Sequence, residues 1–203
     1  MKQTIPKKLA SGVVAAAMTL SLLPAAALAA DSEYSASGAT GSAFTDSGIA
    51  AEDGSYTGYK ISGTDLTIQD SGTYIVSGNC SDGSITIKKG TTGVTLVLDG
   101  LTLTSEDTAP IACNKSSEVK IVAASGTGTL NISAGDDAIH CDYVMNVGAS
   151  GTTGPSITIK ACYEGLEAAT LNILSGNISI LSEDECLNAA NSDFTGYSFS
   201  MTI

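Results

Sequence analysis

The chain contains no arginine and no tryptophan, and aromatic residues supply only 5% of its 203 positions. Its nine lysines face 21 aspartates and glutamates, which gives a formal net charge of −12 at pH 7. Nucleic-acid binding requires a basic surface that often carries aromatic side chains, and this chain has neither. Without arginine, the protein also cannot form bidentate guanidinium clamps on phosphate or carboxylate groups. These absences exclude nucleic-acid binding as a function.

The residues that are present indicate a folded protein rich in β-structure. Apolar residues make up 43% of the chain and charged residues only 15%, which is too hydrophobic for wholesale disorder. The 22 glycines, together with many serines and threonines, punctuate the sequence. The length allows one large domain or two small ones, with a sizeable core in either case.

The N-terminal segment, 1–29, has the features of a secretory signal peptide. Lys2, Lys7 and Lys8 precede an apolar stretch over residues 9–23, and Ala27 and Ala29 fit the small-x-small cleavage pattern. We therefore predict cleavage after Ala29; the alternative, a retained membrane anchor, requires a longer apolar stretch. Cleavage removes three lysines and no acid, which leaves 6 basic and 21 acidic residues and a net charge of −15. We expect a protein that is secreted or held at the cell surface, with no membrane association after cleavage.

The remaining chain divides into a lead-in and one domain. Residues 30–55 are rich in Ser, Ala and Gly without sustained periodicity, which predicts a flexible lead-in. From residue 56 onward, short apolar–polar–apolar words recur at 85–87, 130–132, 157–159, 171–173, 178–180 and 201–203. Alternation with a period of two is typical of short half-buried strands, and Gly, Asn, Asp and Ser separate them as turns require. We therefore predict an all-β domain over residues 56–203.

A second repeated motif favours a solenoid over a sandwich or barrel. The motif runs acid, small residue, Ile or Leu, polar residue, small residue, with copies at 136–141, 163–168 and 184–189 and a fainter relative at 108–112. Its acids Asp137, Glu164 and Glu185 recur once in each of the three full copies. Self-similarity at such a period is typical of coiled solenoids. We predict a right-handed parallel β-helix whose apolar motif positions face the interior, while the acids and polar residues face outward at one corner.

The three motif copies, in this order and together with the segment 95–103, resemble a family of secreted bacterial proteins described as a carbohydrate-binding domain, formerly a domain of unknown function. The resemblance spans about residues 65–203. It implies a right-handed parallel β-helix similar to pectate-lyase scaffolds, calcium sites, and binding of cellulose or acidic plant polysaccharide. Ala138 and Cys186 stand where the family usually has glycine. The chain ends at Ile203, where the family continues with further coils, so the resemblance implies a truncated member.

Stacked acidic turns are the main candidate for a metal site. Neighbouring rungs lie about 4.8 Å apart, so ionised carboxylates in register repel one another unless a cation lies between them. Calcium takes about six to eight oxygen ligands with loose geometry, which carboxylates and backbone carbonyls at a turn can supply. The candidate calcium ligands are Asp136, Asp137, Asp142, Glu164, Glu167, Asp184, Glu185 and Asn188. The alternative is a solvated acidic edge that only keeps the protein soluble.

Tyr163, His140 and Lys160 are the candidates for contact with carbohydrate. His140 is the only histidine and shares the motif column of Glu167 and Asn188, which favours an outward polar role over catalysis. Lys160 shortly precedes Glu164 and is interpreted as a counter-ion to the acids or, in a lyase, as the group that abstracts a proton. The tyrosines that could stack on a sugar ring are Tyr59, Tyr74, Tyr143, Tyr163 and Tyr197, although Tyr163 is equally consistent with packing between rungs.

The five cysteines are an odd number for an exported chain, so at least one thiol stays unpaired within a monomer. They recur along the chain at intervals that follow the coil period, which favours stacking as small buried residues. An oxidising location also permits disulfides, and the sequence leaves the pairing open.

The leading hypothesis is a secreted, non-catalytic protein that uses calcium to bind plant-type polysaccharide, either cellulose or a polygalacturonate-like polymer. A chain with a net charge of −15 repels an anionic polysaccharide unless calcium bridges protein and sugar carboxylates. One alternative is a calcium-dependent polysaccharide lyase or its inactive remnant. Such sites commonly need further cationic side chains, and the lack of arginine argues against this alternative. The other alternative is a structural or adhesive cell-surface solenoid.

Overall fold

The computed structural model describes residues 39–51, 58–124, 128–191, 194 and 197–203. Within these ranges the protein is all-β, with sixteen strands and no helix, and it forms a β-solenoid of about five turns. The described part of the chain accordingly contains no helix that is long and apolar enough to span a membrane. The predicted signal peptide over residues 1–29 lies outside the described residues.

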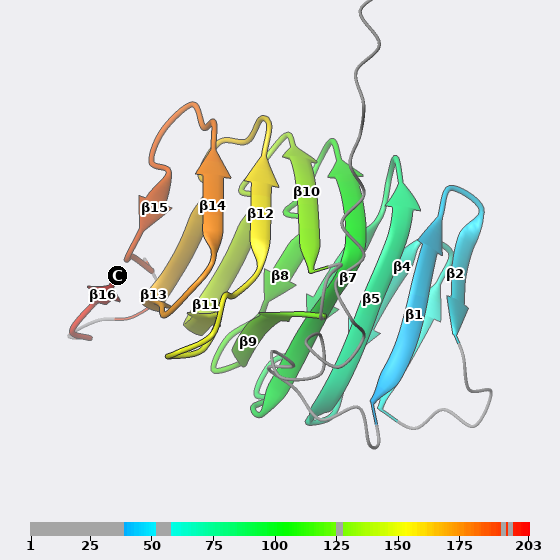
Figure 1. Cartoon of the computed structure of the whole chain (residues 1–203), viewed down its shortest axis with the longest axis horizontal. Coiled ribbons are helices and arrows are strands. Elements are labelled where there is room, and N and C mark those ends of the chain that lie inside the picture. The colour runs from blue at the N-terminus through cyan, green and yellow to red at the C-terminus, as the bar shows by residue number, and fades with distance from the viewer. Residues whose placement is uncertain (1–38, 52–57, 125–127, 192–193, 195–196) are drawn as a thin grey trace, which may run out of the picture.

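Three parallel ladders of strands run along the solenoid (Figure 1). The first ladder contains β4 (Asp65–Ile68), β6 (Ser84–Ile87), β8 (Ile111–Cys113), the first parts of β11 (Ile139–Val147) and β13 (Leu166–Ile173), and β15 (Leu187–Asn188). The second ladder contains β1 (Thr40–Thr45), β5 (Gly72–Cys80), β7 (Val94–Ser105), β9 (Glu118–Ala123), the second parts of β11 and β13, and β16 (Ser200–Thr202). The third ladder contains the last parts of β5 and β7, β10 (Thr129–Ala134), β12 (Ser156–Ile159) and β14 (Asn177–Ile180). The chain therefore advances by one rung per turn.

The apolar residue of each motif copy lies in one column inside the solenoid. In the first ladder, this column consists of Leu66, Ile85, Ile111, Ile139, Leu166 and Leu187. All of them are fully buried except Leu187, which is partly buried in the last rung. Burial of such side chains is the main favourable contribution to folding. The faint motif copy at 108–112 is in register with the others through Ile111, and the predicted parallel solenoid is confirmed.

The N-terminal end of the solenoid is covered by two antiparallel hairpins. One pairs β1 with β2 (Gly48–Ala51), and the other pairs β3 (Tyr59–Ser62) with β4. β1 also joins the second ladder beside β5, and the Phe44 side chain is almost completely buried there. The predicted flexible lead-in over residues 30–55 was therefore wrong for residues 40–51. The segment has no alternation of apolar and polar residues strong enough to predict a strand. It forms one because β1 pairs with the otherwise free edge of β5.

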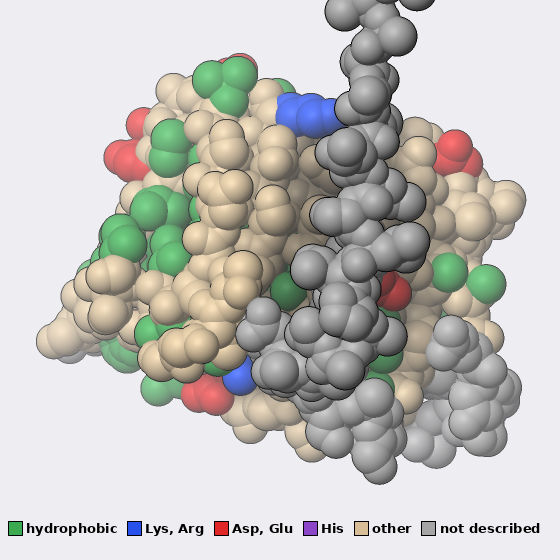
Figure 2. Space-filling model, in the orientation of Figure 1, with side chains coloured by type: hydrophobic (Ala, Val, Ile, Leu, Met, Phe, Trp, Pro, Cys, Tyr) green, Lys and Arg blue, Asp and Glu red, His purple; other side chains and the backbone are tan. Residues whose placement is uncertain are grey.

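The C-terminal end leaves apolar side chains at the surface. Ile173, Ile178, Ile180 and Leu187 line a hollow of about 340 Å³ there, together with Ile203, which is 82% exposed. Figure 2 shows the apolar side chains gathered at this end, whereas uncharged polar groups and backbone dominate the rest of the face in view. The last described rung thus exposes the same interior columns that every earlier rung buries under its successor.

The cysteines are free thiols, and four of them are buried. Cys113 on β8 and Cys141 on β11 are in register on neighbouring rungs, as the stacking prediction required. The hydrogen bond between these two thiols, and then burial, raise the pKa of Cys113 far above its ordinary value. Cys186 is exposed. The cysteines of the interior therefore serve as small core residues.

Candidate functional site

The motif acids lie on turns that stack upon one another. These turns cover residues 135–138, 160–165 and 181–186, lead from the third ladder into the first, and are called the acidic corner below. Backbone hydrogen bonds join them rung to rung. The Ala138 N–H donates to the Glu164 carbonyl at 2.8 Å, and the Gly165 N–H donates to the Glu185 carbonyl at 2.9 Å. The corner therefore continues the ladder pairing, and this pairing brings acids from separate motif copies onto neighbouring rungs.

Gly165 is needed for this stacking. A Cβ atom at this position would collide with the backbone carbonyl of Cys186 and would lie 2.8 Å from Cγ2 of Ile180. The turns of 160–165 and 181–186 are thus too close to accommodate a side chain between them. The glycine of the second motif copy is explained by the close approach of the next rung, and this approach holds Glu164 against Glu185.

His140 lies among three carboxylates, and these four residues form what we call the histidine cluster. Its Nδ1 atom lies 3.0 Å from Asp137 Oδ2 and 3.0 Å from Glu167 Oε2. Its Nε2 atom lies 3.4 Å from Asp142 Oδ1. His140 and Glu167 face outward in register on β11 and β13, and Asn188 follows in the same column on β15. The column that the motif predicted is therefore present.

The charges of the histidine cluster offset one another in part, with one imidazolium among three carboxylates. The hydrogen bonds to Asp137 and then Glu167 raise the pKa of His140 from 6.5 to about 11, although burial opposes the shift. Burial by itself acts to raise the pKa of Asp137, but the hydrogen bond from His140 holds it below its ordinary value. His140 is therefore an imidazolium at neutral pH. The sequence predicted that the stacked acids need a cation between them, and His140 supplies one from the chain itself.

A second group of carboxylates lies beside the histidine cluster and contains no nitrogen ligand. One carboxylate oxygen each from Glu164, Asp184 and Glu185 lies within 4.8 Å of the others, and we call these residues the oxygen group. The Asn188 amide donates to Glu164 Oε2 at 2.9 Å. Burial and then the nearby charges of Glu167 and Asp137 raise the pKa of Glu164, although the Asn188 hydrogen bond lowers it. Burial thus contributes most to the shift, and the like charges of the neighbouring histidine cluster add to it.

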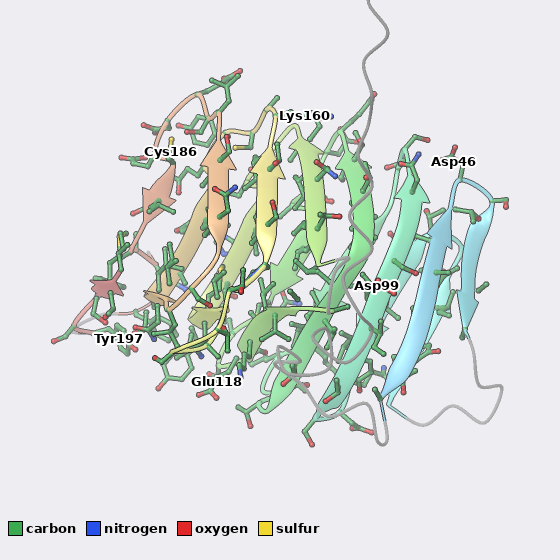
Figure 3. The ribbon with its side chains drawn as sticks, viewed as in Figure 1. Asp46, Asp99, Glu118, Lys160, Cys186 and Tyr197 are labelled. Atoms are coloured by element: carbon green, nitrogen blue, oxygen red, sulfur yellow. The ribbon has the colours of Figure 1, made fainter. Side chains whose placement is uncertain are left out.

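The remaining sequence candidates lie outside both groups. Asp136 is exposed, and its carboxylate belongs to neither group. Lys160 is exposed at the end of β12, where Figure 3 labels it, and its ammonium makes no ion pair with any described residue. The interpretation of Lys160 as a counter-ion to the acids is therefore not supported by the geometry.

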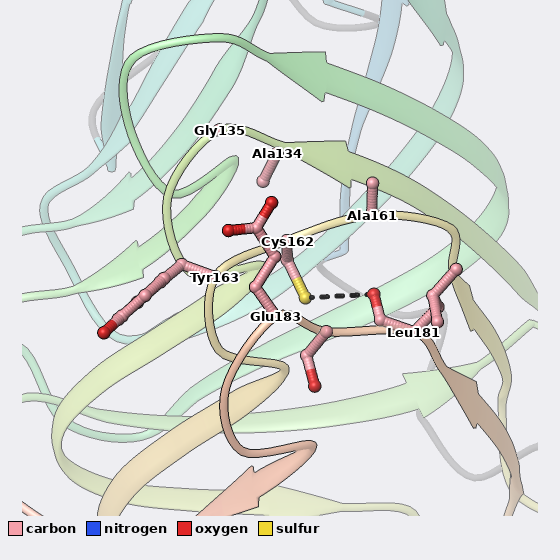
Figure 4. A pocket seen from close by; sticks show the side chains of 8 residues that line it. Ala134, Gly135, Ala161, Cys162, Tyr163, Leu181 and Glu183 are labelled. Atoms are coloured by element: carbon pink, nitrogen blue, oxygen red, sulfur yellow. Dashed lines mark hydrogen bonds between the residues drawn. The ribbon is translucent and has the colours of Figure 1, made fainter.

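Tyr163 is 49% exposed at the acidic corner, beside Asp184. The negative charge of Asp184, and then a hydrogen bond to it, raise the pKa of the Tyr163 phenol. Tyr163 also borders a hollow of about 320 Å³ between the turns, shown in Figure 4, where the Cys162 thiol donates to the Leu181 carbonyl at 3.6 Å. The ring does not pack between the rungs, so it remains available for contact with a ligand.

An aromatic cluster adjoins the histidine cluster, and the sequence interpretation noticed only half of it. Tyr143 follows Asp142 on β11, and its ring centroid lies 6.0 Å from Phe194 and 5.9 Å from Tyr197. Phe194 and Tyr197 are 5.3 Å apart, and Tyr197 lies 5.5 Å from Phe199. We call these four rings the aromatic patch. The spacing of Phe194, Tyr197 and Phe199 is the only sequence signal. Their contact with Tyr143, whose strand β11 lies two rungs before β16, depends on the fold.

One further side chain connects these features. The Asn191 amide is buried and donates to the Asp142 carbonyl at 2.7 Å and to Asp142 Oδ1 at 3.0 Å. It thereby ties the segment after β15 to β11 and fixes the Asp142 carboxylate between the histidine cluster and the aromatic patch. No sequence pattern singles out Asn191.

Two neighbouring lysines precede the three acidic motif copies in the sequence. Lys88 and Lys89 border an open polar hollow of about 350 Å³ together with Gln69 and Asp70, on turns that lead from the first ladder into the second. The acidic corner leads instead from the third ladder into the first. Positive charge thus occupies a different corner of the solenoid from the acids.

A family model described as carbohydrate-binding domain-containing protein matches residues 62–128. This match confirms the resemblance predicted from the sequence. It includes the segment 95–103 but ends before the three acidic motif copies, which begin at residue 136. Comparisons with curated proteins and with solved structures gave no match. The match to this family model and the β-solenoid fold together support carbohydrate binding.

Proposed function

We propose that this protein is a secreted, non-catalytic module that binds an acidic plant-type polysaccharide through calcium held at the oxygen group. The observation that carries the proposal is the meeting of Glu164, Asp184 and Glu185, whose carboxylate oxygens lie within 4.8 Å of one another on two stacked turns. Carboxylates this close repel one another unless a cation joins them.

The two clusters differ in how well they suit calcium. Calcium prefers ligands that are all oxygen, and the oxygen group offers only carboxylates. In the histidine cluster, the imidazolium of His140 already bonds the carboxylates of Asp137 and Glu167, and its pKa of about 11 keeps it charged. We therefore place calcium at Glu164, Asp184 and Glu185, and we assign Asp137, Glu167 and Asp142 to contact with the His140 imidazolium rather than to calcium.

The chain's own residues would present the ion to a ligand. Asn188 orients Glu164, while the stacked backbone of the acidic corner fixes its distance from Glu185. Asp184 and Glu185 are exposed, so the group opens to solvent rather than to the core. Calcium bound there would join the protein carboxylates to a sugar carboxylate and reverse the local sign of charge. This favours a polygalacturonate-like ligand for the acidic corner.

The test measures binding of polygalacturonate by isothermal titration in calcium and in excess EDTA. We expect binding in calcium, none in EDTA, and a loss of at least about tenfold in affinity for the double variant Glu164→Gln/Glu185→Gln. Asp136→Asn is the matched control, because this acid lies on the same corner but outside the oxygen group. Binding that persists in EDTA but disappears in Lys88→Ala/Lys89→Ala would instead assign the polymer to the lysine corner and overturn the proposal.

Two alternatives are separated by simple measurements. A calcium-dependent lyase would produce unsaturated uronate from polygalacturonate, so absorbance of the incubated mixture should stay at baseline if the module is non-catalytic. A structural or adhesive solenoid would bind neither polygalacturonate nor insoluble glucan in a pull-down with calcium. Export is tested by expression of the whole chain in a bacterium and by sequencing of the mature N-terminus, which we expect to begin at Ala30.

A further inference from the structure

We propose that a hollow of about 320 Å³ at the acidic corner binds an organic ammonium ion, that is, an alkyl chain that ends in a primary amine. This hollow, which Figure 4 shows, lies between successive turns and is called the corner hollow below. The inference goes beyond the proposed function, because it assigns a cationic ligand to a place outside the oxygen group.

Small residues on successive turns leave this space open. Ala134 precedes the acidic corner on one rung and Ala161 lies on the next, and neither side chain extends beyond Cβ. The Ala134 N–H donates to the Ala161 carbonyl at 2.9 Å, and the Glu183 N–H donates to the Cys162 carbonyl at 3.0 Å. These hydrogen bonds hold the three turns at the spacing of the rungs, so the corner hollow is fixed by the backbone of the solenoid.

Glu183 contributes the single carboxylate among the described residues that line the corner hollow. Figure 4 shows its side chain reaching past Cys162 toward Gly135. No ion pair joins this carboxylate to any residue that the structure describes. The Cys162 thiol donates to the Leu181 carbonyl, so its hydrogen is not directed to Glu183. The corner hollow thus combines one anionic group with apolar neighbours.

A primary ammonium on an alkyl chain matches this combination. Its N–H donors need one nearby anion and further oxygen acceptors, such as the Ser182 hydroxyl. Its methylene groups gain from contact with Ala161 and Leu181, as the stem of a lysine side chain does on apolar surfaces. Calcium is a poorer match, because it takes about six to eight oxygen ligands and the corner hollow offers a single carboxylate.

Tyr163 adds an aromatic ring at the rim of the corner hollow. The residue is 49% exposed, and a hydrogen bond to Asp184 holds its hydroxyl group. A cation that lies over the face of such a ring is attracted by the partial negative charge of that face. The ring therefore provides a second, weaker contact for an ammonium that approaches Glu183.

The charges around the corner hollow also favour a cation. The same turns carry the oxygen group and Asp136. Their single lysine, Lys160, forms no ion pair with any described residue and therefore does not occupy the place of the ligand beside Glu183. A surface of one sign raises the local concentration of ligands of the opposite sign. A neutral ligand of the same shape gains nothing from this field.

The experiment titrates cadaverine, a linear alkyl diamine, into the isotopically labelled protein in excess EDTA and follows the amide NMR signals. We expect shifts centred on Ala134, Cys162 and Glu183, and an affinity at least about tenfold lower for the uncharged diol of the same chain length. Glu183→Gln should weaken cadaverine at least about fivefold, and Ala161→Leu, which fills the hollow, by a similar factor. Asp136→Asn removes the same charge from the corner but not from the hollow, so affinity should stay within about twofold.

Further variants and probes refine the assignment. Tyr163→Ala should weaken cadaverine about threefold, and Tyr163→Phe, which keeps the ring, should stay within about twofold. Melting curves identify any variant that fails to fold, and Glu183→Gln alters an exposed side chain, so it tests the site independently of Ala161→Leu. Tighter binding of Nα-acetyl-lysine amide than of cadaverine would identify the lysine side chain of a protein as the source of the ammonium. The reverse order would identify a free polyamine, and either order supports the inference.

The inference and the proposed function fail separately. If cadaverine does not bind, or if it binds Glu183→Gln as tightly as the unchanged protein, the corner hollow is not an ammonium site. Loss of cadaverine binding in Glu164→Gln/Glu185→Gln but not in Glu183→Gln would move the ammonium to the oxygen group and also overturn the inference. In each of these cases, calcium-dependent binding of polygalacturonate still upholds the oxygen group as a calcium site. Loss of polygalacturonate binding with cadaverine binding retained would overturn only the calcium proposal.

Discussion

His140 on β11 and Glu167 on β13 are in register on neighbouring rungs, and the Nδ1 atom of the first lies 3.0 Å from Oε2 of the second. Asp137 bonds the same nitrogen from the preceding turn. The cationic side chain of His140 thereby joins two neighbouring rungs at the acidic corner, where Asp137 and Glu167 would otherwise face each other without a counter-charge. The protein supplies part of its own counter-charge, and this has consequences for its response to pH and to calcium.

The histidine cluster should make stability fall as the pH rises above neutral. The pKa of His140 is raised to about 11 from its ordinary 6.5, so its contribution is complete below pH 6.5 and declines steadily toward pH 11. We expect the Tm, measured in EDTA, to fall between about pH 7 and pH 9. His140→Gln cannot hold a proton and should show a much flatter dependence. Equal slopes for the two proteins would contradict the assignment of the imidazolium.

At acidic pH, the dependence of stability on pH has the opposite sign, and Asp137 causes it. The pKa of Asp137 is held below its ordinary value, so its contribution is present above pH 3.8 and is lost as the pH falls below that value. The cluster therefore contributes most between about pH 4 and pH 6.5. A Tm maximum within this window, absent in His140→Gln, is the expected result.

Calcium should stabilise the folded protein through the oxygen group. A ligand that binds only the folded state at 100 times its Kd adds about 2.7 kcal/mol to the free energy of unfolding. We expect calcium to raise the Tm of the unchanged protein and of Asp136→Asn, but not of Glu164→Gln/Glu185→Gln. In EDTA, the double variant should be no less stable than the unchanged protein, because it removes two like charges. An undiminished calcium effect in the double variant would place the ion elsewhere.

Gly165→Ala should weaken the stacking of the acidic corner. The added Cβ would meet the Cys186 carbonyl, and relief of such overpacking typically costs about 1 to 3 kcal/mol. Because the displaced turn carries Glu164 away from Glu185, the calcium-dependent rise in Tm should shrink as well. The measurement is thermal unfolding with and without calcium. A variant with unchanged Tm in both buffers would show that the two turns have room that the structure does not indicate.

The five thiols should differ sharply in reactivity. Cys186 is exposed, whereas Cys80, Cys113, Cys141 and Cys162 are buried. For Cys113, the hydrogen bond to Cys141 and burial raise the pKa, which further suppresses the reactive thiolate. We expect a disulfide reagent to modify one thiol quickly in the folded protein, none in Cys186→Ala, and all five after denaturation. A second thiol that reacts quickly in the folded protein would contradict the burial of the other four cysteines. Modification of fewer than five thiols in denaturant would contradict the absence of a disulfide.

Period and register could be predicted from the sequence because they are local. Each motif copy carries its own apolar residue, acid and polar residue, so equivalent positions such as Ile139 and Leu166 had to fall in one column once the coils stacked. The roles of the acids could not be predicted in the same way. Whether Glu167 faces a metal or an imidazolium depends on small differences in side-chain distance, which a repeat does not encode. Phe44 escaped prediction because its strand depends on the edge of β5.

By itself, the sequence determined that this protein is an acidic β-solenoid, because a repeated pattern of short apolar words can bury its core only by stacking. It also determined that the acids meet at one corner. Only the tertiary structure decided how those acids divide, with one group around His140 and Glu164, Asp184 and Glu185 left as an all-oxygen group. It alone brought Tyr143 to Phe194 and Tyr197, because contacts between distant parts of the chain depend on how one rung lies upon the next.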